Sequence, residues 1–179
     1  MSQSAYGQEP NPFVITRALA NFERSILSGN SAFYQFQNGD DDALTSSEKN
    51  GLNLFFSNKT NCSACHSGFN FSNYAFENNG LYTVYQDNGR MRFTGNQADE
   101  ATFKVPSLRN AGLTAPYMHD GSIQTLSAVV AHYNNGGEAH PNKSTLVKPL
   151  HLTDSEQEDL VAFLNSLTDY SFVHDEKWK

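Results

Sequence analysis

Apolar residues recur with helical spacing near the N-terminus, which predicts an amphipathic helix over residues 12–28. Asn11 followed by Pro12 is a typical helix start, because asparagine caps the first turn and proline fits its first position. Gly29 is a typical helix end. The apolar face of this helix is formed by Ile15, Leu19, Phe22 and Ile26.

Three more helices are expected, over residues 46–57, over about 123–134, and after Thr153. Thr45 with Glu48, and Thr153 with Glu156, match the capping-box pattern. Each helix has an apolar face with helical spacing. The faces are Leu52, Phe55 and Phe56; Leu126, Val129, Val130 and Tyr133; and Leu160, Phe163, Leu164 and Leu167.

The remaining segments are expected to be irregular. Residues 1–11 and 171–179 are interpreted as a disordered tail and a C-terminal tail, and residues 30–44 as a polar loop. Residues 81–85 are expected to form a short strand, and residues 102–121 a long irregular segment with two prolines. Loops of this length inside a compact domain are usually functional. The sequence therefore predicts an all-α fold with long loops and an extra N-terminal helix.

Composition narrows the class of protein. The chain has 179 residues, 38% apolar and 17% charged, which suits one globular domain. Its formal charge of -7 argues against nucleic-acid binding, which requires a basic surface. No apolar run approaches the roughly 18 residues of a membrane span. The first eleven residues lack the charged and apolar regions of a signal peptide.

The two cysteines of the chain stand three positions apart in the sequence C-S-A-C-H, formed by residues 62–66. Zinc would need four ligands, whereas Cys62, Cys65 and His66 supply at most three. A thioredoxin-type redox pair would need a βαβ context, and here a helix precedes the motif. Covalent haem attachment uses this sequence, with both thiols on the haem vinyl groups and the histidine on the iron.

Haem is favoured over zinc and over a disulfide. A helix precedes the motif and an amphipathic helix follows near the C-terminus, which is the order of a cytochrome c core. The 13 Phe and 8 Tyr residues suit an apolar porphyrin pocket. A metal-free structural module is the alternative that carries no haem.

The iron is expected to have a second protein ligand. Met118 is the obvious candidate, and Met91 is a weaker one. As an iron ligand, the thioether of either residue would raise the reduction potential. Either methionine could instead pack against the core. Tyr133 lies on an apolar helix face and points inward, as a core tyrosine would. As a ligand it would supply a phenolate, which Fe(III) must stabilise because the usual pKa of tyrosine is about 10.

Four stretches resemble the C-terminal haem domain of bacterial di-haem cytochrome c peroxidases and the related MauG enzymes. The resemblance runs from about Pro12 to Leu167, with the motifs in the family's order. The stretches are I-T-R-A-L-A-N-F-E-R-S-I-L-S-G-N-S-A-F, T-F-K-V-P-S-L-R-N-A-G-L-T-A-P-Y-M-H-D-G, T-L-S-A-V-V-A-H-Y-N-N-G-G and L-V-A-F-L-N-S-L.

The resemblance implies roles for individual residues. Cys62 and Cys65 would hold one haem c, and His66 would be the proximal ligand. The family's sixth ligand lies on the helix after the H-D-G turn, and the matching residue is Tyr133, which ranks it above Met118. The other implied roles are a haem propionate contact for Arg109, for which a surface arginine is the alternative, and calcium binding by the backbone carbonyls of Thr114 and Pro116.

The family's members carry two haem motifs, whereas this chain has one. The resemblance therefore implies a domain, residues 12–170, that exchanges electrons with a peroxide-reacting haem in an N-terminal domain that this sequence lacks. A stand-alone mono-haem electron carrier is the alternative, and a complete small peroxidase would need an open iron position. His119 and His132 are candidates for acid–base chemistry but are expected to be structural. The implied location is the periplasm, and the implied partners are a peroxidatic haem domain, a small cytochrome or a cupredoxin.

Overall fold

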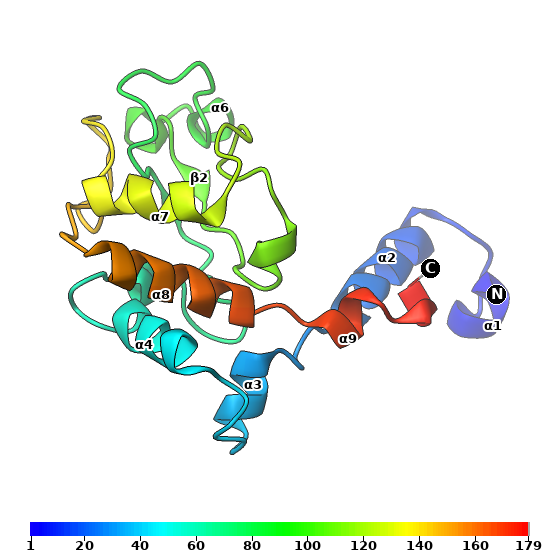
Figure 1. The fold of residues 1–179 in the computed structure, drawn as a ribbon. Coiled ribbons are helices and arrows are strands. Elements are labelled where there is room, and N and C mark those ends of the chain that lie inside the picture. Colours follow the sequence, from blue (N-terminus) through cyan, green and yellow to red (C-terminus); the bar gives the residue numbers. More distant parts are fainter. Residues whose placement is uncertain (179) are drawn as a thin grey trace.

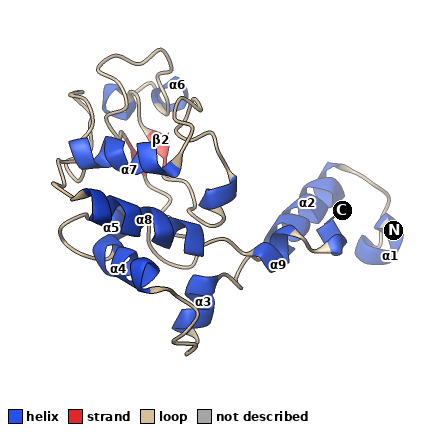
Figure 2. Ribbon diagram, in the orientation of Figure 1, coloured by secondary structure: helices blue, strands red, loops and turns tan. Residues whose placement is uncertain are grey.

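The computed structural model describes residues 1–178, and most of its regular structure is helical (Figures 1 and 2). The sheet structure in these residues is a two-stranded antiparallel pair, so the expected all-α class is confirmed. The helices are α1 (Ser2–Tyr6), α2 (Pro12–Ser25), α3 (Ala32–Gln37), α4 (Ser46–Phe55), α5 (Cys62–Cys65), α6 (Met91–Thr94), α7 (Leu126–Asn135), α8 (Asp154–Ser166) and α9 (Tyr170–Val173). The strands are β1 (Phe76–Glu77) and β2 (Phe103–Lys104), and 3₁₀ turns lie at Gln97–Asp99, Ala111–Leu113 and Glu176–Trp178.

Three predicted helix starts are confirmed by their caps, whereas α7 begins at Leu126, after its Thr125 cap, rather than near residue 123. At α4 the Thr45 hydroxyl accepts the Glu48 N–H, while the Glu48 carboxylate accepts the Thr45 N–H. Thr153 and Glu156 make the same reciprocal pair at α8. Asn11 caps α2 with its side chain. These caps satisfy backbone donors that the first turn of a helix leaves unpaired.

The centre of the fold is the contact between α4 and α8, and α7 packs against the other side of α8 (Figure 1). The crossing is close at Gly51, where a Cβ atom would lie 1.9 Å from the carbonyl oxygen of Asp159. Phe56 was expected on the buried face of α4, but it is 49% exposed because the helix ends at Phe55. The buried core comprises Phe33, Phe55, Phe71, Leu126, Val130, Leu150, Leu152, Leu160, Phe163, Leu164 and Leu167.

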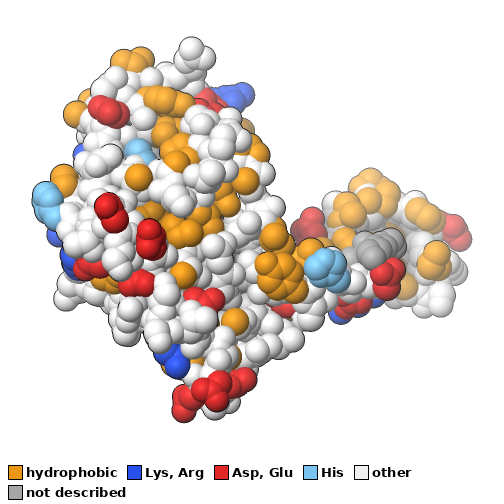
Figure 3. Space-filling model, viewed as in Figure 1, with side chains coloured by type: hydrophobic (Ala, Val, Ile, Leu, Met, Phe, Trp, Pro, Cys, Tyr) orange, Lys and Arg blue, Asp and Glu red, His pale blue; other side chains and the backbone are white. Residues whose placement is uncertain are grey.

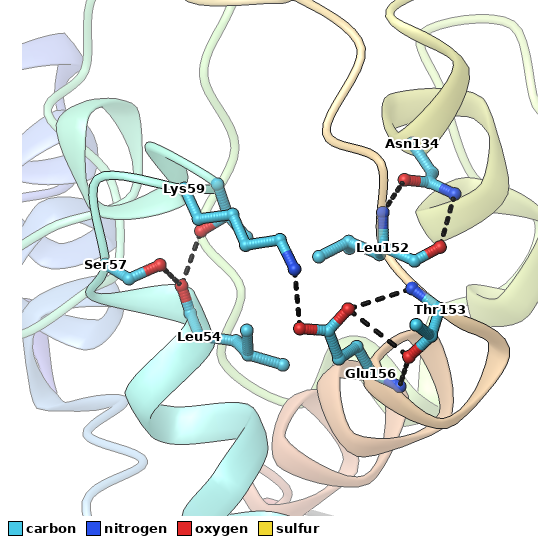
Figure 4. A network of polar contacts seen from close by, with 8 residues as sticks. Leu54, Ser57, Lys59, Asn134, Leu152, Thr153 and Glu156 are labelled. Carbon is cyan, nitrogen blue, oxygen red and sulfur yellow. Dashed lines mark hydrogen bonds and ion pairs between the residues drawn. The ribbon is translucent and has the colours of Figure 1, made fainter.

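A polar network ties the start of α8 to the two neighbouring segments (Figure 4). Lys59 forms an ion pair of 2.6 Å with Glu156, the same carboxylate that takes part in the capping box at Thr153. Asn134, near the end of α7, accepts the Leu152 N–H at 2.8 Å and donates to the Leu152 carbonyl at 3.3 Å. The loop before α5, the end of α7 and the start of α8 are therefore held together.

The prediction of a strand over residues 81–85 is wrong, because these residues form a loop. In this loop the Tyr85 hydroxyl accepts the backbone N–H groups of Leu81 and Tyr82, so a side chain takes the place of a strand partner. The antiparallel pair forms instead between β1 and β2, with Phe76 opposite Lys104 and Glu77 opposite Phe103.

Several short helices lie where loops or tails were expected. Helix α1 lies within residues 1–11, α3 lies within the expected loop 30–44, and α9 begins at the expected C-terminal tail. Helix α2 ends at Ser25 rather than near residue 28, because Ile26 leaves the helical conformation at ψ 83°. Helices this short depend on tertiary contacts, which an apolar pattern over one turn cannot reveal.

Helices α1 and α2 form an arm that projects from the rest of the molecule, and α9 and the C-terminal end lie in the same projecting part (Figure 1). The apolar face of α2 is largely open, since Ile15, Leu19 and Ile26 are 51%, 56% and 39% exposed. Figure 3 shows apolar side chains on the surface of the arm. None of the helices in residues 1–178 is both long and apolar enough to cross a bilayer.

Candidate haem-binding site

A tight turn after α4 brings the cysteine motif into position. The Leu54 carbonyl accepts hydrogen bonds from the hydroxyls of Ser57 and Thr60, at 2.7 and 2.5 Å (Figure 4). Asn61 then adopts a left-handed conformation at φ 54°, which asparagine tolerates. The chain reverses into α5, whose single turn carries both thiols.

Both thiols of α5 are free and partly buried. Burial raises the pKa of Cys62, and its hydrogen bond to the Thr60 carbonyl opposes this effect only in part. Burial also raises the pKa of Cys65, and the nearby Glu77 carboxylate adds to it. No group of three or more His, Cys, Asp or Glu side chains in residues 1–178 is arranged to hold a metal ion, so the zinc interpretation gains no further ligand there.

His66 directly follows α5, and its ring is oriented by the main chain. Its Nδ1 lies 3.0 Å from the Phe71 carbonyl, an arrangement in which Nδ1 carries the proton and Nε2 is left to bind a metal. Burial lowers the pKa of His66, although hydrogen bonds to the Phe71 and Pro106 carbonyls act in the opposite direction. An imidazole oriented through Nδ1 beside two thiols fits the needs of a covalently attached haem.

Tyr133 lies on α7, on the same face as the buried Leu126 and Val130, and packs against the core. Burial raises the pKa of its phenol, while a hydrogen bond to the Asn79 side chain lowers it. The thiols of Cys62 and Cys65 are close enough to Tyr133 to raise the pKa further. Tyr133 and Cys62 also pack against the same buried core cluster.

Met118 contacts the side chain of Asn79. Its Sδ atom accepts a hydrogen bond of 3.1 Å from Nδ2 of Asn79. The two leading candidates for the sixth ligand, Met118 and Tyr133, therefore share Asn79 as a partner. Met91 begins α6, which packs against the 3₁₀ turn Gln97–Asp99.

The two histidines considered for acid–base chemistry both make packing or main-chain contacts. His119 stacks on the Phe103 ring with centroids 3.9 Å apart. Nε2 of His132 lies 3.0 Å from the Asn79 carbonyl, which joins α7 to the loop that carries Asn79. Sequence reasoning did not identify Asn79, because an asparagine in an Asn–Asn–Gly stretch reads as an ordinary turn residue.

Arg109 is enclosed by aromatic rings rather than solvated at the surface. Its guanidinium carbon lies 3.6 Å from the centroid of Phe69 and 4.4 Å from that of Tyr34. Its Nε and Nη2 atoms are buried without a hydrogen-bond partner, and burial lowers the pKa of Arg109. Buried guanidinium donors require an acceptor, and a carboxylate such as a haem propionate suits their geometry.

Thr114 and Pro116 lie in the exposed loop after the 3₁₀ turn Ala111–Leu113. Within the part of the chain that the structure describes, neither backbone carbonyl accepts a hydrogen bond. Both oxygen atoms are therefore available to a hard cation, which would need further oxygen ligands from outside this loop.

Comparison with known proteins gives one family and a consistent set of relatives. The family model for cytochrome c matches residues 49–168. The methylamine utilization protein MauG of Methylorubrum extorquens is 41% identical over 155 residues, which make up 86% of this chain and 43% of the relative. The cytochrome c peroxidase Ccp of Escherichia coli is 37% identical over 163 residues, which make up 86% of this chain and 32% of the relative. The chain spans about half the length of most curated relatives it matches.

Solved structures agree with these relatives. The crystal structure of a MauG-like protein associated with microbial copper homeostasis has a TM-score of 0.90 and 32% sequence identity to this chain. The match covers 99% of this chain and 60% of the other. The matched region therefore includes α2 as well as the helices around the cysteine motif.

Proposed function

Because this chain belongs to the cytochrome c family, as a haem-binding domain related to MauG proteins and cytochrome c peroxidases, we propose that it is the electron-transfer domain of a two-haem oxidoreductase. One haem c would be attached at Cys62 and Cys65, with His66 as the proximal ligand. When bound, the haem supplies a one-electron redox couple. The domain would span residues 12–170 and exchange electrons with a second haem that reacts with peroxide.

The observation that carries this proposal is that two side chains able to bind iron lie near the motif: Tyr133 packs against the same core as Cys62, and Met118 contacts Asn79, which is bonded to α7 through His132. If a haem were bound with His66 and one of these two side chains as its protein ligands, they would leave no position on the iron for peroxide. Such a centre transfers electrons rather than cleaving the O–O bond. A stand-alone electron carrier would use the same ligands, without the second haem.

Tyr133 is the proposed sixth ligand, and its environment defines what it must do. Burial raises the pKa of its phenol, so the proton leaves only when a cation such as Fe(III) stabilises the phenolate. The donor side chain of Asn79 supports the anionic form. A phenolate ligand favours the ferric state and therefore lowers the reduction potential relative to a thioether.

The remaining assignments belong to the same proposal. Arg109 would bind a haem propionate with its buried Nε and Nη2 donors. The carbonyls of Thr114 and Pro116 would contribute to a calcium site completed by the second domain. Covalent haem attachment takes place outside the cytoplasm, so the protein is assigned to the periplasm. Its partner would be a peroxidatic haem domain, a small cytochrome or a cupredoxin.

The experiment that tests the ligand assignment is the absorption spectrum of protein matured with haem c, in both oxidation states, for the wild type and Tyr133→Phe. We expect a covalent haem without the far-red methionine-to-iron charge-transfer band, a changed ferric spectrum in Tyr133→Phe, and a higher reduction potential in that variant. A methionine band in the wild type would assign Met118 or Met91 instead. A colourless protein would contradict haem attachment.

The electron-transfer role is tested by adding hydrogen peroxide to the reduced holoprotein. We expect slow oxidation without sustained turnover, because His66 and Tyr133 would both bind the iron and leave no position for peroxide. Rapid turnover by the domain alone would contradict the proposal and indicate a complete peroxidase. Full, rapid electron exchange with a small cytochrome, but none with a peroxidatic haem domain, would favour the stand-alone carrier.

A further inference from the structure

The side chain of Asn79 has a fixed orientation. Its Oδ1 accepts the Leu81 N–H at 3.2 Å, which directs the amide NH2 group away from the loop and toward Met118. An amide NH2 carries two protons and can therefore serve two acceptors. One of these protons is directed at the Met118 sulfur, 3.1 Å from Nδ2.

The backbone that carries Asn79 is held rigidly. The neighbouring Asn78 is fully buried and bonds to the Ala101 carbonyl at 2.9 Å, while its own carbonyl accepts the Ser144 N–H at 2.9 Å. The Asn79 carbonyl meets His132 of α7 at 3.0 Å, one residue before Tyr133. Asn79 is therefore positioned by the same helix that positions Tyr133.

Met118 is also restrained at its backbone. It has a left-handed conformation at φ 73°, which is unusual for a residue with a long side chain. The next residue, His119, is fixed by stacking on Phe103. Met118 therefore meets Asn79 from a defined direction, and its sulfur is engaged as a hydrogen-bond acceptor.

We propose that Asn79 is a positioning residue that selects Tyr133 over Met118 as the iron ligand, by holding the Met118 thioether as a hydrogen-bond acceptor. This inference rests on the proposed function, because it concerns the sixth ligand of the same haem. A thioether sulfur that accepts an N–H is less available to a metal, so the phenol of Tyr133 meets less competition for the iron.

The test compares the holoproteins of the wild type, Asn79→Ala and the double variant Asn79→Ala/Met118→Leu. In Asn79→Ala we expect the far-red methionine-to-iron band to appear and the reduction potential to shift upward. In the double variant the band should be absent, because leucine cannot ligate iron. Asn142→Ala is the matched control, since it removes an amide that bonds to the Gln97 and Glu100 carbonyls elsewhere.

The outcomes separate this inference from the proposed function. A wild-type spectrum that lacks the methionine band, together with an unchanged spectrum and potential in Asn79→Ala, would overturn the role of Asn79 alone. A methionine band in the wild type would overturn the tyrosine ligand and, with it, the selection. If Asn79→Ala does not retain haem, Asn79→Leu decides, because it keeps the bulk of the side chain and removes the NH2 donor: a methionine band and a higher potential support the selection, and an unchanged spectrum and potential overturn it.

Discussion

At the scale of single residues, Asp169 shows how hydrogen bonds stabilise a buried carboxylate. Its side chain is 2% exposed, and its carboxylate accepts hydrogen bonds from Asn30 N–H, Phe172 N–H and the hydroxyls of Ser28 and Ser171. Burial alone would raise the pKa of Asp169, but these hydrogen bonds outweigh it and hold the pKa below its ordinary value. The carboxylate thus fastens the segment after α2 to the segment that contains α9.

Replacing Asp169 by Asn should lower the free energy of unfolding by roughly 2–3 kcal/mol at neutral pH, because charged hydrogen bonds in a buried site are lost. The folded pKa of Asp169 is lowered, so its stabilisation is present above the unfolded pKa of about 3.9 and disappears as the pH falls through the folded value. Urea unfolding at pH 7, 5 and 3 should therefore show the difference between wild type and variant shrinking only below about pH 4.

The control for this prediction is Asp41→Asn, which removes a carboxylate of the same charge from an exposed turn. It should change the unfolding free energy by less than about 0.5 kcal/mol. A difference between wild type and Asp169→Asn that stayed constant down to pH 3 would contradict the role of the ionised carboxylate.

At the scale of elements, the crossing of α4 and α8 positions the haem motif. Gly51 allows the two helices to approach, since an added Cβ would meet the Asp159 carbonyl carbon at 2.6 Å and the Phe163 Cβ at 2.7 Å. The capping boxes define where both helices begin, and the turn at Leu54 leads from α4 into α5. The geometry of the thiols therefore depends on a helix contact outside the motif.

Gly51→Ala should force the helices apart and lower the free energy of unfolding by about 3 kcal/mol. The neighbours are backbone and core atoms that cannot move aside. Guanidinium unfolding of the holoprotein measures this change, and the yield of covalent haem should fall with it. Asn53→Ala, on the exposed side of the same helix, is the control and should be nearly neutral. Equal stability for both variants would mean that the crossing is not tight in solution.

At the scale of the whole molecule, the projecting arm differs from the haem domain because one face of its helix α2 exposes large apolar side chains. The arm exposes Ile15, Leu19 and Ile26 on one helix face. Contiguous exposed apolar patches on proteins usually mark an interaction surface. The MauG-like relative retains the matching region within a longer chain, since 99% of this chain aligns with 60% of that one. The exposed apolar face of the arm is therefore retained in a region that the longer relative shares.

An isolated chain with this exposed face should self-associate as its concentration rises. Leu19→Glu places a charge in the face and should reduce the average mass measured by sedimentation, while the haem spectrum stays unchanged. Arg24→Ala changes the net charge by the same amount on the polar side of α2 and should leave self-association intact. A wild type that stays monomeric at high concentration, or equal behaviour of both variants, would contradict the prediction.

The local sequence determined the helix starts, the C-S-A-C-H chemistry and the inward face of α7, because caps, motif spacing and periodicity depend on residues within one or two turns of each other. Tertiary structure alone decided the rest. Asn79 contacts Met118 and His132, which lie 39 and 53 positions further along the chain. Arg109 is likewise enclosed by aromatic rings from α3 and from the loop after His66. The apolar pattern of α2 predicted a helix correctly but not its exposure, because periodicity defines a face and only packing decides what covers it.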